Sequence, residues 1–251
     1  MQTGAATHVR EYGGLLAVPE QKTLHWLAGK MPSWINSDHL TLLGLGSMLL
    51  AGAGYWMAQW NKFALVLVVV ALALNWFGDS LDGTLARFRN CQRPRYGYYV
   101  DHVIDLFGTA ALLGGLAFSG YMNPLVGIAL LAAFALVEAE VFLATHVHQV
   151  FRLSTFRFGP TELRVILAIG TLYLLYDPQV TIAGKGPFLL FDFGGAIAIA
   201  GLLSAFVFSG IRNTRALYKA EPLAKQERAV LVLNKLQDCL LIFLSSFSPV
   251  Q

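Results

Sequence analysis

The chain contains the stretch Asp79-Ser80-Leu81-Asp82-Gly83-Thr84-Leu85-Ala86-Arg87 and, after nine further residues, Gly97-Tyr98-Tyr99-Val100-Asp101-His102-Val103-Ile104-Asp105. Four aspartates therefore fall inside a short segment of a chain that is 56% hydrophobic and only 13% charged. Carboxylates at membrane depth are costly, so they need a partner or a function. The stretch is the first candidate for a functional site.

The composition excludes an ordinary soluble domain. So few polar side chains could not cover the surface of a soluble protein of 251 residues. An all-α polytopic membrane protein is the expected class. We expect membrane lipids and no nucleic acid among its partners.

Runs of roughly 20 apolar residues are long enough to cross about 30 Å of hydrocarbon. The sequence predicts six such spans, of which the fifth is the shortest. They cover Leu40–Gln59, Phe63–Ala86, Tyr98–Gly120, Pro124–Thr145, Thr161–Tyr176 and Phe188–Ile211.

The basic residues predict the orientation. Of 18 lysines and arginines, all but Lys62 and Lys185 fall in the N-terminal segment, after spans two and four, or in the C-terminal tail. By the positive-inside rule both ends should face the cytoplasm, in agreement with an even number of spans. We expect an N-terminal segment at 1–38, a six-helix membrane domain at 39–213 and a tail at 214–251.

Both ends are expected to carry helices that lie on the membrane surface. The segment Gln21–Lys30 mixes basic and aromatic residues, and a solvated leader is the alternative. The segment Ala229–Phe247 is apolar but carries Lys235 and Asp238 near its middle. An interfacial helix is favoured there, and a seventh span is the alternative.

Spans two and three run in opposite directions, so the four aspartates should reach similar depth near the cytoplasmic side. Spacings of three and four residues place each pair on one helix face. Carboxylates packed together repel one another unless cations neutralise them. Oxygen-only ligands favour Mg²⁺ or Mn²⁺ over zinc, and such clusters suit two-metal chemistry on phosphates. We expect a site for two divalent ions.

The same stretch has the pattern D-x-x-D-G-x-x-A-R, nine residues, then G-x-x-x-D-x-x-x-D. This resembles the signature of the CDP-alcohol phosphotransferase family (CDP-alcohol phosphatidyltransferase class I), integral membrane enzymes of phospholipid biosynthesis. All eight positions are filled, by Asp79, Asp82, Gly83, Ala86, Arg87, Gly97, Asp101 and Asp105. The resemblance implies a six-helix fold, a homodimer and a cavity facing the cytoplasm.

The resemblance also implies the residue roles. Asp79, Asp82, Asp101 and Asp105 would form the metal site, with Asp105 as the catalytic base. The CDP part of the donor would be contacted by Asp82, Gly83, Ala86, Arg87 and Gly97. For Gly97 taken alone, helix packing is the commoner role of an intramembrane glycine. An acceptor hydroxyl would attack the β-phosphorus, and CMP would leave.

The polar segment after span four is the candidate contact for the acceptor alcohol or a lipid headgroup. Its candidate residues are His146, His148, Arg152, Arg157 and Glu162. The arginines, with Arg164, could hold a phosphorylated acceptor, but nonspecific binding of anionic headgroups explains them more simply. At least one of Glu138 and Glu140 should point into the bundle.

Several functional alternatives stay open. Transfer of phosphatidyl from CDP-diacylglycerol to a small alcohol, in a bacterial inner membrane, is favoured because the chain is compact. Asp101-His102 and Gly159-Pro160-Thr161-Glu162 are similar to the choline- and ethanolaminephosphotransferase branch, which uses diacylglycerol as acceptor. A cation transporter is disfavoured because the outer halves of spans two and three are apolar, and an inactive scaffold because the motif is intact.

Overall fold

The computed structural model describes residues 16–148, 160–182, 184–221 and 235–237. The chain divides into two compact units, 1–207 and 208–251, and each is described by itself. The candidate site lies wholly in the first unit.

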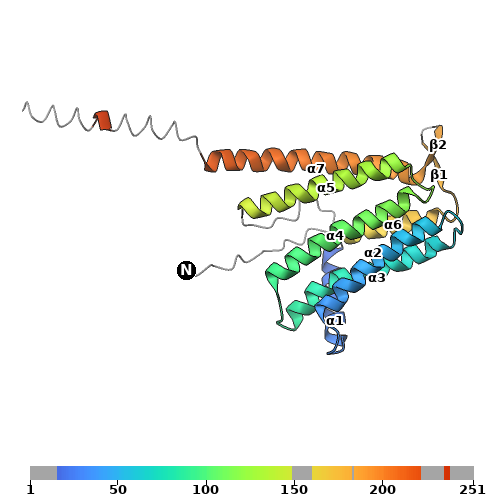
Figure 1. Cartoon of the computed structure of the whole chain (residues 1–251), viewed down its shortest axis with the longest axis horizontal. Helices are drawn as coiled ribbons and strands as arrows, with labels where there is room; N and C mark the ends of the chain where they lie inside the picture. The colour runs from blue at the N-terminus through green and yellow to red at the C-terminus, as the bar shows by residue number, and fades with distance from the viewer. Residues whose placement is uncertain (1–15, 149–159, 183, 222–234, 238–251) are drawn as a thin grey trace, which may run out of the picture. The chain divides into compact units, whose positions relative to one another are not determined.

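The described residues are almost entirely helical, as Figure 1 shows. An all-α polytopic membrane protein is therefore confirmed. The helices are α1 (Ala17–Lys30), α2 (Ser37–Met57), α3 (Ala64–Phe88), α4 (Pro94–Ala117), α5 (Pro124–His148), α6 (Pro160–Tyr173) and α7 (Leu190–Ala220).

Five of these helices are long and apolar enough to cross a membrane, namely α2, α3, α4, α5 and α7. The fifth predicted span differs from the prediction, because α6 has only 14 residues. The chain then turns into a two-stranded antiparallel hairpin, β1 (Gln179–Ile182) and β2 (Lys185–Leu189). This hairpin was not predicted from the sequence.

Although short, α6 contacts its neighbouring helices at two places along its length. Near its start Arg164 contacts Asp79 of α3, and further along the Thr171 hydroxyl lies 2.5 Å from the Tyr55 hydroxyl of α2. Just beyond its end, Leu174 is buried with Ala58 and Leu65. The α6 segment thus runs from the aspartates to the end where α2 connects to α3.

Glycines set how closely α2 approaches its neighbours. A Cβ added to Gly78 of α3 would lie 2.6 Å from the carbonyl oxygen of Leu40. A Cβ on Gly115 of α4 would overlap the carbonyl of Gly52. Small residues let membrane helices pack with their backbones in contact. The α2–α3 and α2–α4 contacts therefore bring the two halves of the aspartate motif together.

This packing predicts different outcomes at two adjacent glycines. Gly115→Ala should destabilise the protein by about 1–3 kcal/mol, because α4 must move away from α2. Gly114→Ala is the matched control, since a Cβ there meets no atom within 4 Å among the described residues. Thermal unfolding in detergent micelles measures both. Equal melting temperatures for the two variants would contradict the close α2–α4 contact.

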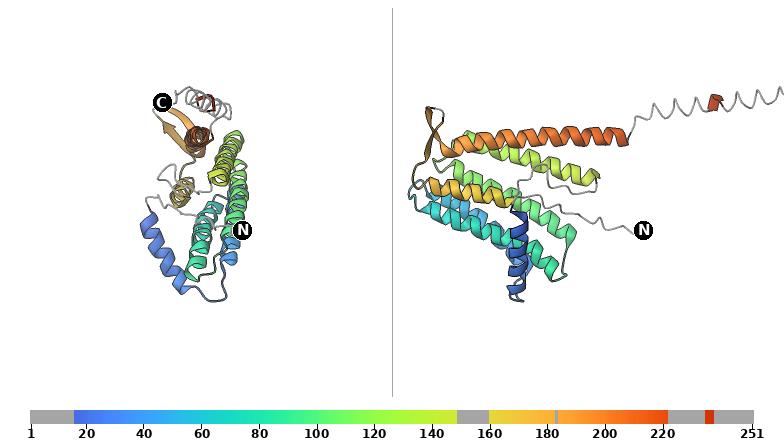
Figure 2. Two further views of the ribbon diagram at one scale, coloured as in Figure 1. Left: turned by 90° about the vertical axis from the view of Figure 1, so that its left-hand side faces the viewer. Right: turned by 180° about the vertical axis from the view of Figure 1, so that it is seen from behind.

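Helix α1 crosses the direction of helices α2 to α6, as the two views of Figure 2 show. It packs on α3, where Leu24 and Ala28 are buried with Leu81 and Leu85. A helix within the predicted interfacial segment at Gln21–Lys30 is thus present. Its position on a membrane surface stays a prediction.

The C-terminal predictions are only partly covered by the described residues. Helix α7 continues to Ala220, past the expected boundary at 213/214. Of the segment at 229–247, the structure describes only residues 235–237, which are helical. The choice between an interfacial helix and a span therefore lies outside the described residues.

Candidate active site

The connection between α3 and α4 is tied to the start of α2. Arg89 donates hydrogen bonds from its guanidinium to the carbonyl oxygens of Met31, Pro32 and Ile35. Arg93 forms an ion pair with Asp38. Pro94 begins α4 at a position where proline costs no helical hydrogen bond. These contacts hold the connection between the two motif-bearing helices against the start of α2 and the segment before it.

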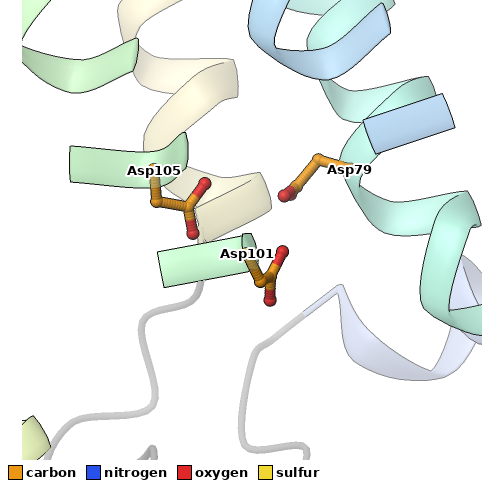
Figure 3. A group of neighbouring side chains, drawn as sticks. All are labelled: Asp79, Asp101 and Asp105. Atoms are coloured by element: carbon orange, nitrogen blue, oxygen red, sulfur yellow. The ribbon is translucent and has the colours of Figure 1, made fainter. Parts of the chain in front are cut away.

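Three of the four aspartates meet at one point, as Figure 3 shows. Asp79 comes from α3, and Asp101 and Asp105 come from α4. Each offers one carboxylate oxygen, and these oxygens lie within 4.8 Å of one another. The predicted convergence of the two helix faces is therefore present for these three residues.

Asp82 lines the same pocket but has protein partners of its own. It is 9% exposed, and its Oδ2 accepts a hydrogen bond of 2.6 Å from the Thr41 hydroxyl of α2. Its Oδ1 accepts from the Gly83 amide. Asp82 thus stands slightly apart from the cluster of three, held against α2.

A positive charge beside the cluster comes from α6. Arg164 Nη2 lies 2.5 Å from Asp79 Oδ2, and Arg164 Nε donates to Asn75 Oδ1 at 2.7 Å. Asn75 is 4% exposed and donates in turn to the Gly44 carbonyl at 3.0 Å. The guanidinium is therefore fixed by a buried amide as well as by charge attraction.

The cluster of three fits a divalent cation. Oxygens that share one Mg²⁺ or Ca²⁺ at 2.0–2.6 Å lie at most about 4–5 Å apart, which is the spread of the three carboxylates. The donor set consists of oxygens only, as these hard cations prefer. Asp82 would need to release its present partners to join them.

The residues predicted to contact the nucleotide lie at the C-terminal end of α3 and the start of α4. Gly83 and Ala86 are partly exposed, and Arg87 is exposed. Gly97 is exposed, and an added Cβ there would meet no atom within 4 Å among the described residues. Helix packing among the residues that the structure describes therefore does not explain Gly97, and open access to a ligand stays the prediction.

The predicted acceptor residues are only partly described. His146 is exposed near the end of α5, while Arg152 and Arg157 lie outside the described residues, as does the side chain of His148. Glu162 is buried at 8% exposure, and its Oε1 accepts a hydrogen bond from the Leu16 amide at 2.9 Å. Glu162 therefore joins α6 to the start of the N-terminal helix.

A fifth acidic residue, Glu138 of α5, lies close to the site. It interacts electrostatically with His102 and Asp101. At least one of Glu138 and Glu140 was expected to point into the bundle. Phe142, four residues after Glu138 on the same face of α5, packs against His102 of α4 with ring centroids 5.0 Å apart, so Glu138 lies on the face of α5 turned toward α4.

Sequence reasoning missed Thr41 and Asn75, and it did not pair Arg164 with Asp79. No motif includes these residues, because they come from α2, α6 and the middle of α3. Their one signal is polarity inside apolar segments, since such groups are expected to be hydrogen-bonded or functional. Asn75 in an otherwise apolar run could have been found in this way.

The fold and the site define an integral, multi-pass membrane protein with a carboxylate cluster suited to a divalent cation. The family model for CDP-alcohol phosphatidyltransferase matches residues 34–207, which is most of the chain. The chain therefore belongs to the CDP-alcohol phosphatidyltransferase family, and it is a transferase of phosphate-containing groups in phospholipid synthesis.

Among solved structures, the chain is similar to the phosphatidylinositol phosphate synthase of Mycobacterium tuberculosis, crystallised with CDP-DAG bound. The sequences are 18% identical, the match covers 78% of this chain and 94% of the mycobacterial chain, and the TM-score is 0.49. A comparison with curated protein sequences gives no match.

Proposed function

We propose that this enzyme transfers a phosphatidyl group from CDP-diacylglycerol to the hydroxyl of a small alcohol and releases CMP. The observation that carries the proposal is the meeting of Asp79, Asp101 and Asp105 in one pocket of a CDP-alcohol phosphatidyltransferase. The compact membrane domain favours this reaction over the branch that uses diacylglycerol as acceptor.

Asp105 is the proposed catalytic base. The acceptor hydroxyl donates a hydrogen bond to the Asp105 carboxylate while its oxygen attacks the β-phosphorus of the donor. The new oxygen–phosphorus bond forms as the bond from this phosphorus to the bridging oxygen of CMP breaks. The proton passes to Asp105 as the hydroxyl becomes acidic during attack.

The neighbouring aspartates are proposed to hold two divalent cations, Mg²⁺ or Mn²⁺. Asp79, Asp82, Asp101 and Asp105 supply the oxygen ligands. When bound, the cations neutralise the pyrophosphate charge and orient the displacement. Thr41 holds Asp82 at the wall of the pocket, and Arg164 holds Asp79.

The nucleotide is proposed to lie along Gly83, Ala86, Arg87 and Gly97. Small residues let the donor approach the helix backbone, and the Arg87 guanidinium offers two parallel donors to phosphate oxygens. The acceptor would enter from the side of His146 and the segment that follows α5. The pocket is proposed to face the cytoplasm of a bacterial inner membrane, in a homodimeric enzyme.

The structure gives the diacylglycerol-acceptor branch no added support. Two of the residues that suggested this branch, Thr161 and Glu162, have partners near the N-terminus. The Thr161 hydroxyl donates to Glu20 of α1, and Glu162 accepts from the amide of Leu16, the residue before α1. Their present contacts are therefore explained by packing between helices.

The experiment is a substrate panel. The purified full-length chain is incubated with CDP-diacylglycerol or CDP-aminoalcohols, a panel of acceptor alcohols and Mg²⁺ or Mn²⁺, and lipid product and CMP are identified by mass spectrometry. We expect CMP release with CDP-diacylglycerol, and its loss when EDTA removes the cation. Release with CDP-aminoalcohols and diacylglycerol instead would replace the proposed reaction by the alternative, and no release with any pair would reject both.

A further inference from the structure

One oxygen atom joins three helices beside the candidate site. Oε1 of Glu20 in α1 accepts two hydrogen bonds. The first donor is the indole Nε1 of Trp76 in α3, at 2.8 Å. The second donor is the Thr161 hydroxyl of α6, at 2.6 Å. Glu20 is thus a bridge between α3 and α6.

The start of α6 has a second link to the N-terminal segment. The Leu16 amide donates to Glu162 Oε1 at 2.9 Å, next to the Glu20–Thr161 bond. Two consecutive residues of the first turn of α6 are therefore bonded to residues at the beginning of the described chain. These contacts fix where α6 begins relative to α3.

The Glu20 bridge lies directly beside the contacts that reach the aspartate cluster. On α6, Arg164 follows Thr161 by three residues, which is one turn of the same helix face. On α3, Asn75 precedes Trp76, and Asp79 follows it by three residues. The bridge and the Arg164 contacts therefore join neighbouring turns of the same two helices.

Loss of the bridge would affect the cluster through Arg164. Without the Glu20 carboxylate, the partly buried Trp76 and Thr161 donors lose their acceptor, and leaving such donors unsatisfied is unfavourable. The short helix α6 would then shift to satisfy them. Because Arg164 contacts Asp79 at 2.5 Å, a small shift is enough to break that contact.

We propose that Glu20 is a positioning residue of the aspartate site. It holds the first turn of α6 against α3, and so keeps Arg164 bonded to Asp79 with the carboxylate turned toward Asp101 and Asp105. This inference rests on the cation site of the proposed function. It assigns a role in that site to the N-terminal helix, which lies outside the aspartate motif.

The test measures binding of Mn²⁺ alone to the full-length chain in lipid nanodiscs, with free Mn²⁺ followed by electron paramagnetic resonance. Glu20→Ala should weaken Mn²⁺ binding about tenfold, as loss of groups that orient metal ligands commonly does. Glu20→Gln keeps an acceptor oxygen and should stay within about twofold of wild type. Gln21→Ala, an exposed neighbour on α1, is the matched control and should not change the affinity.

A double-mutant cycle tests whether Glu20 acts through Arg164. Arg164→Ala alone should weaken Mn²⁺ binding about 10-fold or more, and Glu20→Ala added to it should cause little further loss. Independent, additive effects would overturn the inference. A Glu20→Ala chain that melts at lower temperature but binds Mn²⁺ like the wild type, while fully folded, would reduce Glu20 to a structural role and also overturn it.

These outcomes are separate from those of the substrate panel. If no substrate pair releases CMP but the Mn²⁺ affinities change as expected, the proposed reaction fails and the role of Glu20 stands. If the wild type turns over but Glu20→Ala leaves Mn²⁺ affinity unchanged, only this inference fails. A wild-type chain that binds no Mn²⁺ would overturn the inference together with the proposed cation site.

Discussion

Asp105→Asn should lower CMP release by about 10²–10⁴-fold, which is the usual contribution of a general base. The asparagine amide keeps one oxygen in the cluster with Asp79 and Asp101, so it can still ligate a cation. It cannot accept the proton of the attacking hydroxyl. The loss should therefore appear in the chemical step, while binding of CDP and of Mn²⁺ is largely retained.

Single-turnover CMP release and separate CDP and Mn²⁺ titrations measure these two effects. Asp177→Asn removes the same charge from an exposed residue after α6 and is the control for the charge change alone. If Asp105→Asn releases CMP at a rate near that of wild type, Asp105 is not the base. If binding of both CDP and Mn²⁺ is lost, its role is to hold the cation.

The aspartate cluster was predictable because its residues are local in sequence and its partners are two consecutive helices. Spacings of three and four fix a helix face, and antiparallel neighbours bring two such faces together. The convergence of Asp79, Asp101 and Asp105 follows from this geometry. The apolar runs likewise predicted the positions of α2, α3, α4, α5 and α7.

The contacts that hold the cluster could not be predicted in the same way, because they join residues distant in sequence. Arg164 and Asp79 are 85 residues apart, and Thr41 and Asp82 are 41 apart. A positively charged residue near a membrane surface is already explained by topology, and Arg164 was considered only as a contact for a phosphorylated acceptor, so there was no reason to pair it with Asp79. Only the packing of α6 on α3 supplies that reason.

The short α6 and the hairpin after it show a second limit of sequence reasoning. Apolar residues continue from Thr161 to Tyr176, which predicts one span, but the helix ends at Tyr173 and the chain turns toward β1. A 14-residue helix can remain in the bundle because partners such as Tyr55 satisfy its polar Thr171. Such tertiary contacts are not visible in hydropathy.

Asp79→Ala should weaken Mn²⁺ binding by roughly 100-fold or more and abolish measurable CMP release, for two additive reasons. The cluster loses one of its three converging carboxylates. In addition, Arg164 keeps its positive charge at a partly buried position without its carboxylate partner, and removing one member of such a pair is costly. Mn²⁺ titration and CMP release measure the two consequences.

The second reason predicts that the effect of Arg164→Ala on Mn²⁺ affinity reverses when Asp79 is replaced by alanine. The loss of a cation ligand alone does not predict this reversal. In the wild-type chain Arg164→Ala should weaken Mn²⁺ binding, because Arg164 orients Asp79. In the Asp79→Ala chain there is no carboxylate to orient, and the guanidinium only repels the cation, by about 1–4 kcal/mol for charges a few ångströms apart in a partly hydrated site. Arg164→Ala added to Asp79→Ala should therefore recover part of the lost affinity. A further loss in the double variant would mean that Arg164 supports the site through α6 packing and not through Asp79.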